Sequence, residues 1–66
     1  MNLTINGENR QFDDGLTLQA LLVELGLGEK PVVVELNRKA LAPSEFEVQE
    51  LSDGDQLEII TIAAGG

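Results

Sequence analysis

One segment of this chain has the period of an amphipathic helix, and the segments around it have the patterns of strands. Four leucines recur at spacings of three and four residues: Leu18, Leu21, Leu22 and Leu25. The pattern predicts a helix over residues 17–25, with Thr17 as the N-cap and Gly26 as the left-handed residue that ends it. A helix with one apolar face must cover another layer, so the remaining segments are expected to build a sheet.

The segment before the helix predicts a β-hairpin. Residues 2–6 alternate between polar and apolar side chains, which is typical of a half-buried strand. Asn6 and Gly7 tolerate the positive φ angles of a tight turn. The return strand is predicted over residues 9–13, with Phe12 facing the core.

The segment after the helix predicts three further strands. Residues 32–36 are short and β-branched, and a turn at residues 37–38 leads to a short return strand over residues 39–41. The turn at residues 53–55 precedes the last strand, residues 56–62. Between these strands, Ser44 and Glu47 have the spacing of a capping box on a single helical turn, and a short extended piece is expected around Val48.

The order of these elements predicts an α+β roll. We expect a mixed sheet of four to five strands with one main helix packed on one face, and the last strand lying beside the first. A chain of 66 residues is near the lower limit for folding on its own core, and we expect residues 1–66 to form a single domain.

The last strand carries a second apolar set. If Leu57 and Ile59 face the helix, then Ile60 and Ile62 face away from it, and Val33 joins them. An apolar patch on an uncovered sheet face is typical of a protein interface, so Val33, Ile60 and Ile62 are candidate docking residues. The alternative is that a central strand is simply apolar on both faces.

Composition excludes several kinds of site. The chain has no Cys and no His, which removes thiolate metal sites, Cys nucleophiles and the usual general base. Twelve acidic residues against four basic ones give a net charge of −8, which disfavours nucleic acid and favours a basic protein partner. Asp53, Asp55 and Glu58 are expected near the docking end, where they could meet such a partner; the alternative, favoured for any single one of them, is that it only solvates the surface. No segment is long and apolar enough to span a membrane and no signal peptide is evident, so we expect a cytoplasmic protein.

The sequence closes with a run of small residues: Ala63, Ala64, Gly65 and Gly66. Such a run makes a thin, flexible peptide that can enter a narrow channel where any side chain would clash. A free carboxylate at Gly66 would be its reactive group. A carboxylate is inert until it is activated, for instance by adenylation, after which it can accept a nucleophile such as sulfide. A frayed end without chemistry is the alternative.

The sequence resembles the ubiquitin-like β-grasp sulfur carriers, and more closely the thiamin-biosynthesis carriers of the ThiS family. The resemblance covers the whole chain and lies in these stretches: MNLTING, DDGLTLQALLVELGL, VVVELNRKAL with its Asn37 turn, LSDGDQLEI and IAAGG. The Gly65-Gly66 end is typical of the superfamily. The residue before it, Ala64, lies in a context that varies within such carriers, so the tail alone does not settle the branch.

The resemblance implies a protein co-substrate and not an enzyme. A partner adenylates the Gly66 carboxylate with ATP and magnesium, and the adenylate becomes a thiocarboxylate with sulfur from a donor such as a cysteine desulfurase. Thiazole synthase then takes the sulfur for the thiazole ring of thiamin. The chain itself would bind no cofactor or metal, and the absence of Cys fits a sulfur carried on the C-terminus.

Two other classes stay open on the sequence. One is another carrier of the same fold, serving molybdopterin synthesis or tRNA thiolation, or a modifier joined to lysines. The other is a ubiquitin-fold binding module without chemistry. An enzyme is disfavoured because so short a chain offers little cleft in which to shift the pKa of a carboxyl group.

Overall fold

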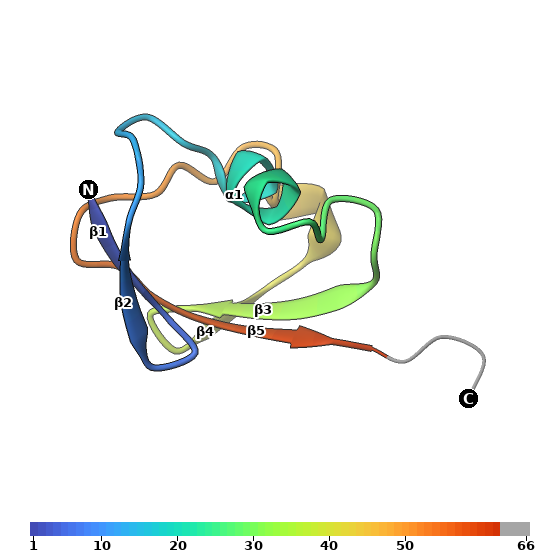
Figure 1. Ribbon diagram of the computed structural model, residues 1–66. Helices are drawn as coiled ribbons and strands as arrows, with labels where there is room; N and C mark the ends of the chain where they lie inside the picture. Colours follow the sequence, from blue (N-terminus) through green and yellow to red (C-terminus); the bar gives the residue numbers. More distant parts are fainter. Residues whose placement is uncertain (63–66) are drawn as a thin grey trace.

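The structure, a computed structural model, describes residues 1–62. Its elements in chain order are β1 (Asn2–Ile5), β2 (Glu8–Gln11), α1 (Leu18–Glu24), β3 (Val32–Leu36), β4 (Lys39–Leu41), the 3-10 helix η1 (Pro43–Glu45) and β5 (Gln56–Thr61). The strands form one five-stranded sheet in the order β2-β1-β5-β3-β4, and α1 lies across one face of it (Figure 1). The predicted α+β roll is confirmed.

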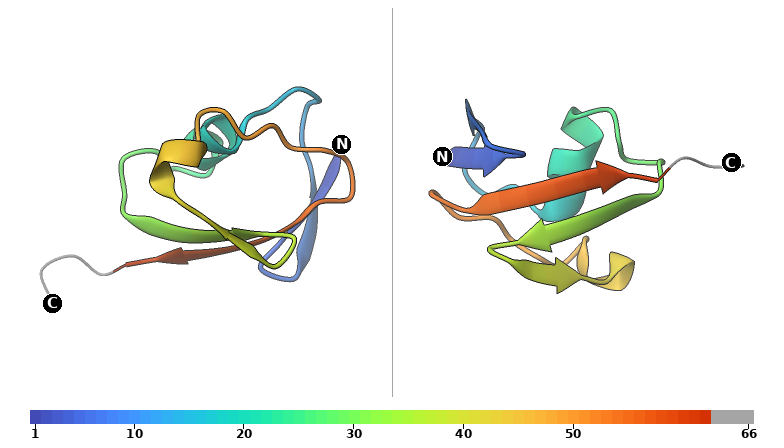
Figure 2. Two further views of the ribbon diagram at one scale, coloured as in Figure 1. Left: turned by 180° about the vertical axis from the view of Figure 1, so that it is seen from behind. Right: turned by 90° about the horizontal axis from the view of Figure 1, so that it is seen from below.

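The last strand lies in the middle of the sheet, between two hairpins. β5 pairs antiparallel with β3 over five positions, from Val32↔Thr61 to Leu36↔Leu57. On its other side it pairs parallel with β1, through Thr4↔Gln56 and Ile5↔Leu57. The prediction that the last strand lies beside the first is therefore confirmed. Figure 2 shows the sheet from below, with β5 across its centre and α1 behind it.

The leucine stripe of α1 supplies the helix side of the core. Leu18, Leu21 and Leu22 are almost fully buried, while Leu25 and Phe12 are half-buried at its edge. The buried apolar residues come from every layer: Leu3, Ile5, Leu18, Leu21, Leu22, Val34, Leu36, Phe46, Leu51, Leu57 and Ile59. Since burying one such side chain contributes roughly 1.5–3 kcal/mol, this shared core stabilises the contact between helix and sheet.

The predicted N-cap and the predicted left-handed residue at the end of the helix are both confirmed. The Thr17 Oγ1 atom accepts a hydrogen bond from the backbone N–H of Ala20 at 3.2 Å, which satisfies one of the free donors of the first turn. The helix ends with Leu25 as its C-cap, and Gly26 follows with φ +78°, a conformation that a side chain disfavours.

The region after β4 differs from its prediction. The capping box expected at Ser44 and Glu47 is wrong, because η1 begins earlier, with Ala42 at its N-cap and Pro43 at its first position. Proline's fixed φ favours that starting point. The Glu45 carboxylate accepts the backbone N–H of Ala42 at 2.9 Å, so the carboxylate that reaches back is two residues earlier than expected.

Two extended segments also differ in position from their predictions. The extended piece expected around Val48 is wrong: this residue lies in a turn and is 76% exposed. The extended contact occurs at the Thr17–Glu50 bridge, where the loop hydrogen-bonds to the start of α1.

β2 ends at Gln11 instead of residue 13, because the β1–β2 register ends at the Asn2–Gln11 pair. No helix within residues 1–62 is long and apolar enough to cross a bilayer.

Truncation of Leu22 tests the helix–sheet core. Leu22→Ala removes a side chain that is 1% exposed, so we expect it to lower the free energy of unfolding by about 2–5 kcal/mol through lost burial and the cavity left behind. Urea denaturation followed by circular dichroism measures the change. The matched control is the neighbouring Val23→Ala, which trims a side chain that is 61% exposed. A cost at Leu22 no larger than at Val23 would contradict this core.

Candidate functional site

The sheet face away from α1 carries exposed apolar side chains. Leu57 and Ile59 are buried on the helix side of β5, as predicted. Val33 and Ile60 are 46% and 61% exposed, so the alternation predicted from the sequence is confirmed for residues 57–60. Ile62, which follows β5 and also borders the groove beside α1, is 50% exposed. We call these three residues the apolar strip. Their predicted role in docking stays a prediction, because the structure contains no partner.

The apolar strip leads from the sheet to the segment that follows β5. Val33 and Ile60 are directly opposite each other in the β3–β5 register. The backbone N–H of Ile62 donates to the Pro31 carbonyl at 3.0 Å, which continues the pairing one residue beyond the end of β5. The strip is thus held on the sheet up to the last residue that the structure describes.

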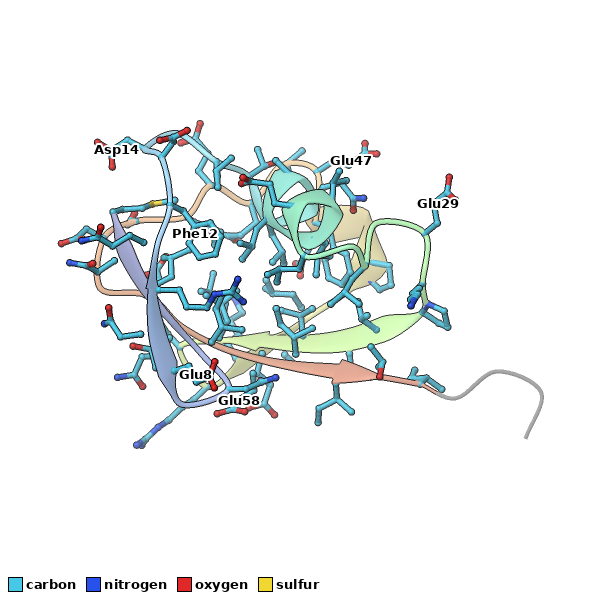
Figure 3. The ribbon with its side chains drawn as sticks, in the orientation of Figure 1. Glu8, Phe12, Asp14, Glu29, Glu47 and Glu58 are labelled. Carbon is cyan, nitrogen blue, oxygen red and sulfur yellow. The ribbon has the colours of Figure 1, made fainter. Side chains whose placement is uncertain are left out.

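Two carboxylates lie beside the apolar strip. Glu35 of β3 and Glu58 of β5 are opposite each other, two residues before Ile60 on β5 and two residues after Val33 on β3. Both are exposed. We call Glu35 and Glu58 the carboxylate pair. Figure 3 shows Glu58 below the sheet, on the side away from α1.

The β1–β5 contact is extended by one side chain. β1 ends at Ile5, but the Asn6 carboxamide reaches β5 and copies a backbone pair: its Nδ2 donates to the Ile59 carbonyl at 3.0 Å, and its Oδ1 accepts the Ile59 N–H at 2.8 Å. Asn6 has φ +50°, as expected for the turn with Gly7. The sequence patterns predict Asn6 at the end of the first strand and in the turn, but they do not indicate that its carboxamide reaches β5.

The expectation that Asp53 and Asp55 lie near the docking end is wrong. Both precede β5, whose six residues place them roughly 20 Å from the end of that strand. They also have local partners: Asp53 Oδ1 accepts the N–H of Asn2 at 2.6 Å, and Asp55 accepts from Asn37 Nδ2 at 3.0 Å and from the Ser52 N–H at 2.8 Å. Of the three acids expected there, only Glu58 lies on the face with the apolar strip.

The described residues hold no constellation typical of catalysis or metal binding. No group of three or more carboxylates within residues 1–62 could hold a metal ion. A groove of about 430 Å³ lies between α1 and the start of β3. Its apolar lining includes Leu22, Leu27, Val32, Phe46 and Ile62, and its charged residues are Glu29 and Lys30.

The predicted reactive end lies outside the described residues. This holds for the proposed modification site Gly66 and for the predicted tail residues Ala63, Ala64 and Gly65. What the structure provides is the surface from which they continue: the apolar strip, the carboxylate pair and the end of the central strand.

Comparisons with known proteins agree in family and fold. The model of the ThiS family matches residues 3–66. Over 62 residues the chain is 39% identical to the sulfur carrier protein ThiS of Thermus thermophilus, covering 94% of this chain and 95% of that protein. The crystal structure of a thiamine biosynthesis protein (ThiS) from Geobacter metallireducens matches with a TM-score of 0.84 and 35% identity over the full length of both chains.

A longer relative contains only a part similar to this chain. Over 66 residues the chain is 42% identical to a thiazole synthase of Paramagnetospirillum magneticum. The match covers all of this chain but only 20% of that protein, so the chain spans about a fifth of the relative's length.

Replacement of Asn6 tests the side-chain contact that holds β5. Asn6→Gly keeps the backbone conformation available but removes both hydrogen bonds to Ile59, so we expect a loss of about 1–3 kcal/mol in unfolding free energy. We also expect faster hydrogen exchange at the Ile59 amide, measured by NMR. Asn9→Gly, at an exposed β2 position, is the control for the general cost of glycine. Unchanged exchange at Ile59 would contradict the role of Asn6.

Proposed function

The chain belongs to the ThiS family, and from this premise we propose that it is a sulfur carrier of thiamin biosynthesis. The observation that carries the proposal is a match reaching from residue 3 through Gly65 and Gly66, in a chain whose length is close to that of a relative named as a sulfur carrier. The names of such relatives also support the prediction that the chain is a carrier and not a catalyst.

The proposed chemistry takes place at the carboxylate of Gly66. A carboxylate oxygen attacks the α-phosphorus of ATP, and pyrophosphate leaves to give an acyl adenylate. A sulfur nucleophile at the oxidation level of sulfide then attacks the acyl carbon, AMP leaves, and a thiocarboxylate remains. ATP and magnesium would be bound by the adenylating partner, whose positive groups would stabilise the negative charge on the α-phosphoryl oxygens and on the leaving pyrophosphate.

The small residues before Gly66 suit this reaction. The carboxylate must reach a nucleotide held inside another protein, and Ala63, Ala64 and Gly65 offer little side chain to obstruct its entry. We assign Gly66 the modification and the other three the role of a thin arm. Cys and His are absent from the whole sequence, so no thiol or imidazole of the chain competes for the activated carboxylate.

The apolar strip is the proposed docking surface for the partners. Val33 and Ile60 are exposed on the open sheet face, and the exposed Ile62 follows them directly before the arm in the sequence, so a protein that receives the arm also meets these residues. The partners are an adenylating enzyme, thiazole synthase and a sulfur donor such as a cysteine desulfurase. The relative named thiazole synthase supports the second partner, because part of that longer protein is similar to this whole chain.

Intact-mass measurement tests the modification of Gly66. The protein is incubated with ATP, magnesium, sulfide and the adenylating enzyme of its host, and we expect a mass increase equal to the exchange of one oxygen for sulfur, located on Gly66 by fragmentation. The control is a variant with one residue added after Gly66, which should stay unmodified although it folds. Modification of the extended variant, or no modification of the original chain, would contradict the proposal.

A charge on the apolar strip tests docking. We expect Ile60→Asp to weaken binding to the adenylating enzyme at least about tenfold, because the carboxylate would have to be desolvated in an apolar contact. Isothermal titration calorimetry gives the dissociation constant, and urea denaturation checks that the variant is folded. Val48→Asp adds the same charge to an exposed valine outside the strip and should bind normally. Equal binding of the Ile60 variant would remove the strip from the interface.

A further inference from the structure

Two negative charges are opposed on the open sheet face. Glu35 and Glu58 are cross-strand neighbours in the β3–β5 register, so their Cβ atoms are about 5.5 Å apart. Like charges at directly opposite positions of an antiparallel pair destabilise the sheet. The neighbouring strand β4 adds no charge beside this pair, because its residue opposite Glu35 is Ala40. The carboxylate pair therefore weakens the free protein.

Within residues 1–62, neither Glu35 nor Glu58 forms an ion pair with a basic group. The one ion pair found in residues 1–62 joins the N-terminal amine to Asp14. Arg10 and Lys39 stand opposite buried leucines in the strand register, which places them on the helix side, and Arg10 lies 5.6 Å from the ring centre of Phe12. Lys30 and Arg38 belong to the loops before and after β3.

The carboxylate pair and the apolar strip form one continuous surface. Side chains two residues apart on a strand point to the same face, so Glu58 is next to Ile60 and Glu35 is next to Val33. A protein that covers the strip also covers the pair. Burying two carboxylates without an opposite charge is costly, so a partner that fits this surface must bring a cation to them.

The geometry points to an arginine side chain of the adenylating partner that sits between Glu35 and Glu58 and selects this carrier. This inference rests on the proposed function, which supplies the partner. A guanidinium group is planar, keeps its charge and has five N–H donors, so it can donate to both carboxylates at once. The apolar strip packs beside it and excludes water from the ion pair.

Other occupants of the face fit less well. A second copy of this chain would oppose Glu35 and Glu58 with the same residues and would add to a net charge of −8. Phosphate backbones and anionic lipids are repelled in the same way. A metal ion would find only two carboxylates here, and residues 1–62 contain no cluster of three or more His, Cys, Asp or Glu side chains that could hold one.

Neutral variants of the full chain test the inference. Glu35→Gln and Glu58→Gln keep the size of each side chain and remove its charge. We expect each to raise the dissociation constant for the adenylating enzyme about fivefold, as measured by titration calorimetry at low salt, with a shallower salt dependence than the original chain. We also expect both variants to be at least as resistant to urea as the original chain, because the repulsion is relieved.

The matched control is Glu47→Gln. It changes the net charge by the same amount at an exposed residue that lies on the helix side of the molecule (Figure 3), and it should bind as the original chain does. A loss of affinity equal to that of the pair variants would reduce the effect to general attraction between charged proteins. That result would overturn the inference.

Two further outcomes separate this inference from the proposed function. If both pair variants bind normally while Ile60→Asp binds weakly, the arginine contact is wrong and the carrier function stands. If the original chain binds the enzyme but Gly66 is never converted to a thiocarboxylate, the proposed function fails, while the binding data still decide the role of the pair.

Discussion

The position of β5 between β1 and β3 is the constraint on which the rest of the structure depends. The two hairpins form through local turns, but each would leave an open edge without the strand that joins them. β5 pairs with both, and its side chains Leu57 and Ile59 supply part of the surface that α1 covers. One strand therefore joins the two hairpins into a single sheet, completes the core and precedes the segment that leads to Gly66.

The open face departs from what stability alone would favour. Val33, Ile60 and Ile62 leave apolar area in water that burial would otherwise use, and the neighbouring Glu35 and Glu58 repel each other. Both departures occur on the same strands and the same face, while every described position on the helix side that is buried is apolar. A surface that is suboptimal in two independent ways, next to a proposed reactive end, is best explained by a partner that covers it.

The sequence predicted those features that follow from period and local geometry. The leucine spacing gave the helix face, Thr17 and Gly26 gave its ends, and the parity of β5 separated Ile59 from Ile60. Contacts that depend on the register between strands cannot be predicted from these sequence patterns. To predict that Glu35 lies opposite Glu58, one must know which residue of β3 pairs with which residue of β5. A shift of the register by one residue would change every pair.

The wrong predictions have local physical reasons. Ser44 and Glu47 have the right spacing for a capping box, but Pro43 fixes a helical φ one residue earlier and so sets the start of η1. Asp53 and Asp55 are close to β5 in sequence, but they precede its first residue, and an extended strand of six residues separates them from its other end. The sequence patterns predict Asn6 at the end of the first strand and in the turn, and only the position of β1 beside β5 shows that its carboxamide pairs with Ile59.

A carrier without catalytic groups must be recognised by its surface. Its arm of small residues offers a partner almost no side chains to recognise. Any carrier with the same four final residues would present the same arm to the partner's active site. Discrimination therefore has to come from the folded part of the chain. Apolar contacts supply affinity with little geometric selectivity, whereas two opposed carboxylates demand a cation at one defined point. Under the proposed function, the apolar strip would supply affinity for the partners, and Glu35 with Glu58 would favour those that bring a cation to this point.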